Sequence, residues 1–132
     1  MLTVISNLLT ALAQLLKQNH LLAKDYQKHL LYERIQGGID EDIDRIKEIA
    51  LACDYPESIA NAEDSLYNAA EVVEEITDIE TLEKEIIKTI NKAIAKISKT
   101  DDFAKEAITN MLGDIAEKRL RDLYLLKIGG AK

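Results

Sequence analysis

Apolar residues recur at helical spacing along nearly the whole chain, and this pattern limits the possible folds more than any other feature of the sequence. In the first segment, residues 2–22, they fall three and four positions apart, which places them on one face of a helix. These residues are Ile5, Leu8, Leu9, Leu12, Leu15 and Leu16. Glycine (five) and proline (one) are rare, a composition that favours helix. We therefore predict an all-α protein.

Breaks in the helical pattern divide the chain into four long helices and a short one. Asp25 is a typical N-cap residue for the second helix, the only proline lies within residues 54–58, and residues 77–80 form a capping box. The predicted helices are, in order, residues 2–22, 26–52, 62–75, the segment from 77–80 to about 99, and the segment from 100–102 to 129–130.

The length and the helix order indicate how these helices are connected. A chain of 132 residues is long enough for a single domain, residues 1–132, with a core of its own. The short helix lengthens the connection between the second and third long helices. In a four-helix bundle such a connection crosses the bundle and gives the up-down-down-up order of ferritin-like folds. We predict a ferritin-like four-helix bundle with a short extra helix in that connection.

The charge and the cysteine content exclude several classes of function. The formal net charge is −7 at pH 7, and an acidic protein repels nucleic acid and anionic membranes while it attracts cations. Because no Lys/Arg-rich tail is visible at either end, we expect no direct binding to DNA. The only cysteine, Cys53, excludes an internal disulfide framework and fits a reducing cytoplasm. No apolar run approaches the roughly 20 residues of a membrane span, so we expect a cytoplasmic protein.

The strongest candidate for chemistry is the segment 20–48, which holds both histidines of the chain. His29 and Glu33 lie four residues apart, as do Asp44 and Glu48, and the two pairs are symmetric in sequence about a midpoint near Gly38. At about 100° per residue, these four side chains share one face of the second helix, away from its isoleucine stripe. Charged residues at helical spacing usually form a solvated face, so the spacing alone fits either such a face or a metal site.

Axial distance decides how many chains the metal site would need. Glu33 and Asp44 are separated by eleven residues, about 16 Å along a helix, whereas metal–oxygen bonds are roughly 2 Å long. The two pairs can therefore share an ion only if the second helix packs antiparallel against its own copy. About a two-fold axis at the midpoint, His29 would face Glu48 of the other chain, and Glu33 would face Asp44.

A pair of glycines lies at this midpoint and three carboxylates follow it. Gly37 and Gly38 each cost a helix about 1 kcal/mol relative to alanine. They fit either a kink or the close approach of two helices, and the sequence leaves both interpretations open. Asp40, Glu41 and Asp42 fit either a surface that guides cations or an ordinary solvated face.

Other motifs of catalysis are absent from the sequence. It contains no Gly-rich phosphate loop, CxxC, HExxH or serine elbow. It also lacks Glu-x-x-His, the inward-facing pair of single-chain di-iron bundles. The two-chain site therefore remains, and its imidazole and carboxylate groups suit Fe(II), Mn(II) or Zn(II).

The segment 29–48 resembles the ligand pattern of the Dps-like mini-ferritins, the ferritin-like family named for DNA-binding proteins from starved cells. Members of that family carry a histidine on the first helix and His-x3-Asp-x10-Asp-x3-Glu on the second. The matching residues here are His20 for the first helix and His29, Glu33, Asp44 and Glu48 for the second.

The resemblance extends along most of the chain, with some departures. IDEDIDRIKEIAL at 39–51 is similar to the family's second helix, and AITNMLGDIAEKRLRDLYLL at 107–126 is similar to its last. Glu33 stands where aspartate is usual, and the spacing from His20 to His29 is about three residues shorter than the family's. The family's tryptophans and its Lys-rich tail have no counterpart in this sequence.

What the resemblance implies is a function in iron metabolism. The chain would oxidise Fe(II) with peroxide or dioxygen at a site shared between two subunits, store ferric iron in a hollow dodecamer, and protect against peroxide stress. His29, Glu33, Asp44 and Glu48 would be the catalytic residues, and His20 would join them as a metal ligand. Iron would be the bound ion, with other divalent metals as possible substitutes.

Two other functions stay open at this point. A divergent ferritin-like bundle with weak or no metal chemistry would serve as a structural or assembly protein. A helical interaction module would have the antiparallel dimer through the second helix as its whole function.

Overall fold

The computed structural model describes residues 2–53, 62–101 and 103–130. These residues form five helices and no strand, which confirms the predicted all-α class. The helix break predicted at residues 54–58 lies outside the described residues. The same holds for residue 102, within the start predicted for the last helix at 100–102. The helices are α1 (Leu2–Leu22), α2 (Tyr26–Ala52), α3 (Ala62–Glu75), α4 (Ile79–Ile97) and α5 (Lys105–Gly130).

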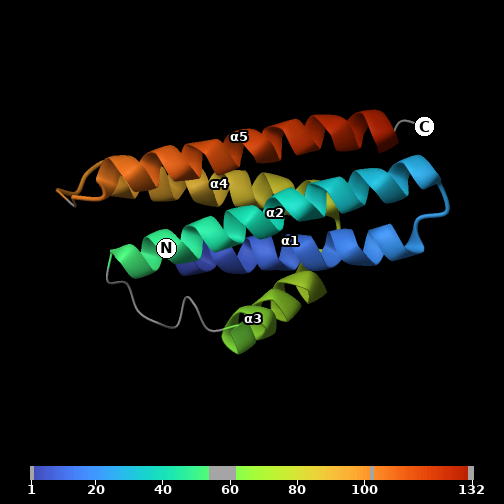
Figure 1. The fold of residues 1–132 in the computed structure, drawn as a ribbon, viewed down its shortest axis with the longest axis horizontal. Coiled ribbons are helices and arrows are strands. Elements are labelled where there is room, and N and C mark those ends of the chain that lie inside the picture. The colour runs from blue at the N-terminus through green and yellow to red at the C-terminus, as the bar shows by residue number, and fades with distance from the viewer. Residues whose placement is uncertain (1, 54–61, 102, 131–132) are drawn as a thin grey trace.

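The four long helices pack side by side (Figure 1). α1 contacts α2 and α4, and α5 contacts the same two helices. Within the described ranges, no contact joins α1 to α5 or α2 to α4. Figure 1 shows that α2 and α4 run in one direction and α1 and α5 in the other, while α3 lies against α1.

The core is built mainly from leucine and isoleucine of the four long helices. All six residues of the apolar stripe predicted for the first helix are buried. α2 contributes Ile35, Ile39, Ile46 and Ala50, spaced by four, seven and four residues, so it buries one stripe and leaves its opposite face exposed. None of the helices in the described ranges combines the length and the apolar character that crossing a bilayer requires.

A tight turn at residues 23–25 joins α1 to α2 and sets the position of both histidines. Asp25 is the N-cap of α2, as predicted, and its Oδ1 accepts a hydrogen bond of 2.9 Å from the backbone N–H of Gln27. This bond satisfies one of the N–H groups that a helix start leaves unpaired. The turn places His20, in the last turn of α1, beside His29, in the first turn of α2.

Candidate metal centre

His20 and His29 form a stacked pair at the α1–α2 turn, with ring centroids 3.7 Å apart and 29° between the ring planes. The Nδ1 of His20 lies 3.1 Å from the carbonyl oxygen of His29, and the Nδ1 of His29 lies 3.0 Å from the carbonyl oxygen of His20. A carbonyl oxygen only accepts hydrogen bonds, so each Nδ1 carries a proton and donates it. In the neutral rings, each Nε2 therefore keeps its lone pair for a metal ion.

Glu33 completes a group of three potential ligands, because it lies one helical turn after His29. One ligand atom from each of His20, His29 and Glu33 lies within 4.8 Å of the other two. Two of three ligands bound to one ion at roughly 2 Å in tetrahedral geometry lie roughly 3.3 Å apart, so the most distant pair of these atoms needs to draw together by up to roughly 1.5 Å. The histidines are half-buried and Glu33 is exposed, so the cluster opens to the surface.

Asp44 and Glu48 do not join this cluster within one chain. Both are exposed on α2, and Asp44 is about 16 Å further along the helix than Glu33. Partial burial, and then the negative charge of Asp44, raise the pKa of Asp40 above its usual value of 3.8. This part of α2 therefore presents closely spaced carboxylates to its surroundings.

The exposed face of α2 also carries large apolar residues. Tyr26 is 71% exposed, Leu30 43% and Leu51 48%. At about 100° per residue, all three fall within about 60° of Glu33 and Asp44 around the helix. The candidate ligands therefore lie on a face where apolar area is open to contact with another surface.

Gly37 lies on this face of α2, whereas Gly38 is half-buried beside α5. The helix continues through both glycines, and a Cβ added to either would meet no atom of the described residues within 4 Å beyond the adjoining residues and backbone of α2 itself. Contacts inside the chain therefore do not require glycine at these two positions.

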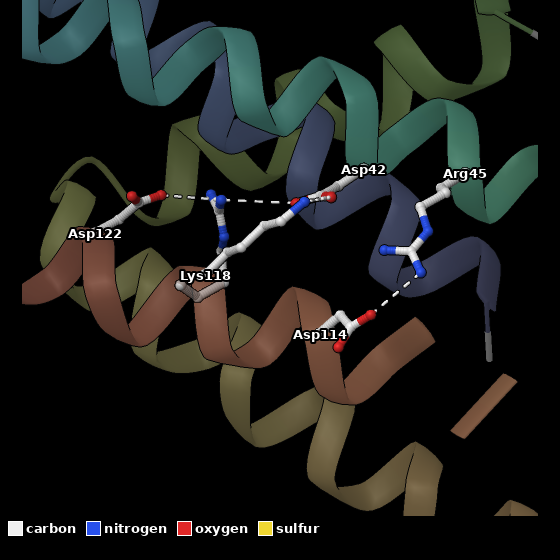
Figure 2. A network of polar contacts seen from close by, with 6 residues as sticks. Asp42, Arg45, Asp114, Lys118 and Asp122 are labelled. Atoms are coloured by element: carbon white, nitrogen blue, oxygen red, sulfur yellow. Dashed lines mark hydrogen bonds and ion pairs between the residues drawn. The ribbon is translucent and has the colours of Figure 1, made fainter. Parts of the chain in front are cut away.

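A buried ion network joins α2, α4 and α5, and Figure 2 shows the part of it that links α2 to α5. Asp42 is 0% exposed and accepts a hydrogen bond of 2.9 Å from Lys118 Nζ. The guanidinium of Arg119, itself 1% exposed, lies 3.7 Å from Asp42, 3.7 Å from Glu83 and 2.9 Å from Asp122. The prediction that Asp42 lies on the surface is therefore wrong: it falls three residues after Ile39, on the buried stripe, and cations from α5 compensate its charge.

Burial is the largest influence on the pKa values of two carboxyl groups in this network, Glu83 and Asp122. It raises the pKa of Glu83 from its ordinary value of 4.5 to about 8, although the Arg119 charge opposes the shift. Neither carboxylate oxygen of Glu83 has a hydrogen-bond partner among the described residues. Burial likewise raises the pKa of Asp122, again against the charge of Arg119. The network therefore holds at least one carboxyl group that favours its neutral form near pH 7.

Sequence reasoning missed this network because its members are far apart in the chain and have ordinary surface residue types. Only Asp42 gave an indication, since it occupies a core position of the α2 pattern. Comparisons of the chain with protein-family models, with curated proteins and with solved structures find no match.

Proposed function

We propose that this chain binds Fe(II) at a site shared between two subunits, oxidises it, and stores the ferric product in a homo-oligomer. The observation that carries this proposal is the group His20, His29 and Glu33, in which two imidazoles anchored through Nδ1 lie close to a carboxylate. The proposal also rests on the resemblance of this segment to the ligand pattern of the Dps-like mini-ferritins.

The donor set supports iron as the substrate. Two imidazoles and one carboxylate with open positions are the ligands of many non-haem Fe(II) sites. The backbone carbonyls that hold each Nδ1–H fix the tautomer and the orientation of both rings. Carboxylates favour the harder Fe(III) product, whereas imidazoles moderate the affinity.

A second copy of the chain would complete the site. An antiparallel α2–α2 contact about the midpoint of the ligand pairs brings Glu48 of the partner subunit to His29 and Asp44 of the partner subunit to Glu33. The same two-fold axis sets Tyr26 against Leu51 of the partner subunit, so two exposed apolar side chains would cover each other at each end of the interface.

The close approach of the two helices would occur at Gly37. This glycine lies on the ligand face, and no neighbouring element among the described residues occupies the space beside it. Glycine at this position lowers the stability of the helix, and no contact among the described residues requires it. Close approach of the backbone of a second α2 helix would explain why glycine is present.

The reaction we propose is electron transfer from Fe(II) to peroxide. Each hydrogen peroxide takes one electron from each of two Fe(II) ions, accepts two protons, and leaves as two water molecules. Dioxygen is the alternative oxidant. The contacts and directions of α1, α2, α4 and α5 support the proposal of a ferritin-like four-helix bundle. Assembly into a hollow dodecamer in the cytoplasm is proposed from the family resemblance alone.

Anaerobic titration with Fe(II), followed by addition of peroxide or dioxygen, tests this function. We expect ferric absorbance from the parent protein and its loss in His29→Ala and in Asp44→Ala. Glu117→Ala, which removes an exposed carboxylate from α5, is the matched control and should behave as the parent. A parent that forms no ferric product, or ligand variants that form it normally, would overturn the proposal and leave a structural bundle as the function.

A further inference from the structure

A pocket of about 190 Å³ lies between α2 and α5, and four of its eight lining residues are cations. Its charged residues are Arg34 from α2 and Lys118, Arg119, Arg121 and Asp122 from α5. Asp42 and Asp122 pair with Lys118 and Arg119, so Arg34 and Arg121 remain as an excess of positive charge in a chain whose net charge is −7. This local excess of positive charge attracts anions.

The cations of the pocket divide into an inner and an outer pair. Lys118 and Arg119 make the ion pairs to Asp42 and Asp122 that hold α5 against α2. Arg119 is almost fully buried, and its Nε has no hydrogen-bond partner among the described residues. That donor is covered by the chain itself, so Arg119 acts on a ligand in the pocket through its charge and not through this atom.

The outer pair is free to receive a ligand. Arg34 and Arg121 are exposed, and neither makes an ion pair within the part of the chain that the structure describes. Both lie near enough to lower the pKa of Asp122 through their charge, although burial raises it overall. Their guanidinium groups carry planar forks of donors that match the oxygens of phosphate.

We propose that this pocket binds a phosphate group, either as inorganic phosphate or as the terminal group of a small phosphate ester. Arg34 and Arg121 donate to its oxygens, while Lys118 and Arg119, held in place by Asp42 and Asp122, form the neighbouring wall of the pocket. The volume of about 190 Å³ suits a small anion and is below the roughly 300 Å³ at which pockets for drug-sized ligands begin.

The pocket is distinct from the candidate metal centre. Arg34 and Gly38, which line it, lie about 80° and 120° around α2 from Asp44, on the side that faces α5. The two sites also take ligands of opposite charge. Binding of phosphate to metal-free protein therefore tests the pocket independently of iron oxidation.

Calorimetric titration of the full chain with inorganic phosphate and with glycerol phosphate, at constant ionic strength, tests the assignment. We expect saturable binding by the parent, and binding about tenfold weaker or more in Arg34→Gln/Arg121→Gln, because each change removes a charge-assisted hydrogen bond. Arg45→Gln, which removes the same charge from α2 at the exposed pair with Asp114, should bind as the parent. The relative affinities of the two probes distinguish free phosphate from an ester.

Asp122→Asn provides a second variant with the opposite expectation. It removes the only carboxylate of the lining and keeps an oxygen for Arg119, so phosphate should bind more tightly. The proposal is overturned if neither probe binds saturably to the parent, or if the double arginine variant binds as tightly as the parent. It is also overturned if Arg45→Gln loses as much affinity as the double variant, or if Asp122→Asn binds phosphate no more tightly than the parent.

Discussion

The imidazole rings of His20 and His29 each donate a hydrogen bond to the backbone of the other residue: each Nδ1 lies 3.1 Å or less from the other residue's carbonyl oxygen. This reciprocal arrangement fixes both tautomers before any ligand arrives, and it leaves the lone pair of each Nε2 for coordination. The short turn at 23–25 makes the arrangement possible, since it brings the last turn of α1 against the first turn of α2.

His20→Ala should weaken binding of Fe(II) or Zn(II) by about 100-fold, because it removes one ligand and the ring that stacks on His29, whereas the backbone carbonyl that orients His29 remains. Anaerobic calorimetry with each metal measures this loss. Gln18→Ala changes an exposed residue on the same turn of α1 and should leave the affinity unchanged. Equal affinity in the parent and His20→Ala would remove His20 from the ligand set.

Gly37→Ala should stabilise the folded monomer by up to about 1 kcal/mol, because alanine favours helix and its Cβ meets open space within the chain. It should at the same time weaken the dimer, since the added methyl group separates the two helices at the proposed axis. Urea unfolding and analytical ultracentrifugation measure the two effects. Gly113→Ala, at an equally open position on α5, should stabilise the chain without weakening the dimer, and the same result for Gly37→Ala would contradict the axis.

Leu51→Lys should weaken the dimer by about tenfold or more, because it places charge at an apolar contact with Tyr26 of the partner subunit. Sedimentation at a series of concentrations gives the dissociation constant. Leu120→Lys makes the same change at an exposed leucine on α5 and serves as the control. If both variants dimerise equally well, the apolar contact assigned to Leu51 is wrong.

Glu83 should make the folded state less stable as the pH rises. In the unfolded chain Glu83 ionises near its ordinary pKa of 4.5, whereas in the folded protein its pKa is about 8. Between these values the folded state binds more protons, so the contribution of Glu83 to stability is complete below about pH 4.5 and declines up to about pH 8. Glu83→Gln, which stays neutral, should be more stable than the parent near pH 9 and similar to it near pH 5 in urea unfolding. A constant difference between the two proteins across this range would contradict the assignment.

The sequence predicted the parts of this structure that depend on local pattern. Helical spacing of apolar residues located the buried stripe of α1, and the N-cap preference of aspartate located the start of α2 at Asp25. Helical geometry also required that Glu33 and Asp44 lie too far apart to share an ion within one chain.

The parts that the sequence did not predict depend on residues brought together from distant segments. Asp42 is buried because Lys118 and Arg119, on α5, supply its counter-charge. Charged side chains are rarely buried without such partners, so composition favoured the surface for Asp42 even though its spacing favoured the core. The phosphate pocket is likewise visible only once Arg34 and Arg121 lie on the same side of the packed helices.

Subunit complementation tests the shared iron site most directly. His29→Ala and Asp44→Ala should each be inactive alone, because every site of either homodimer lacks one ligand. A mixed dimer contains one chain of each variant. Both substitutions then fall in the same site, and the other site keeps all of its ligands. After subunit exchange of equal amounts, half of the dimers are mixed, so Fe(II) oxidation should return to about a quarter of the parent rate. If exchange is verified and no oxidation returns, the site is not shared between two chains and the account is wrong.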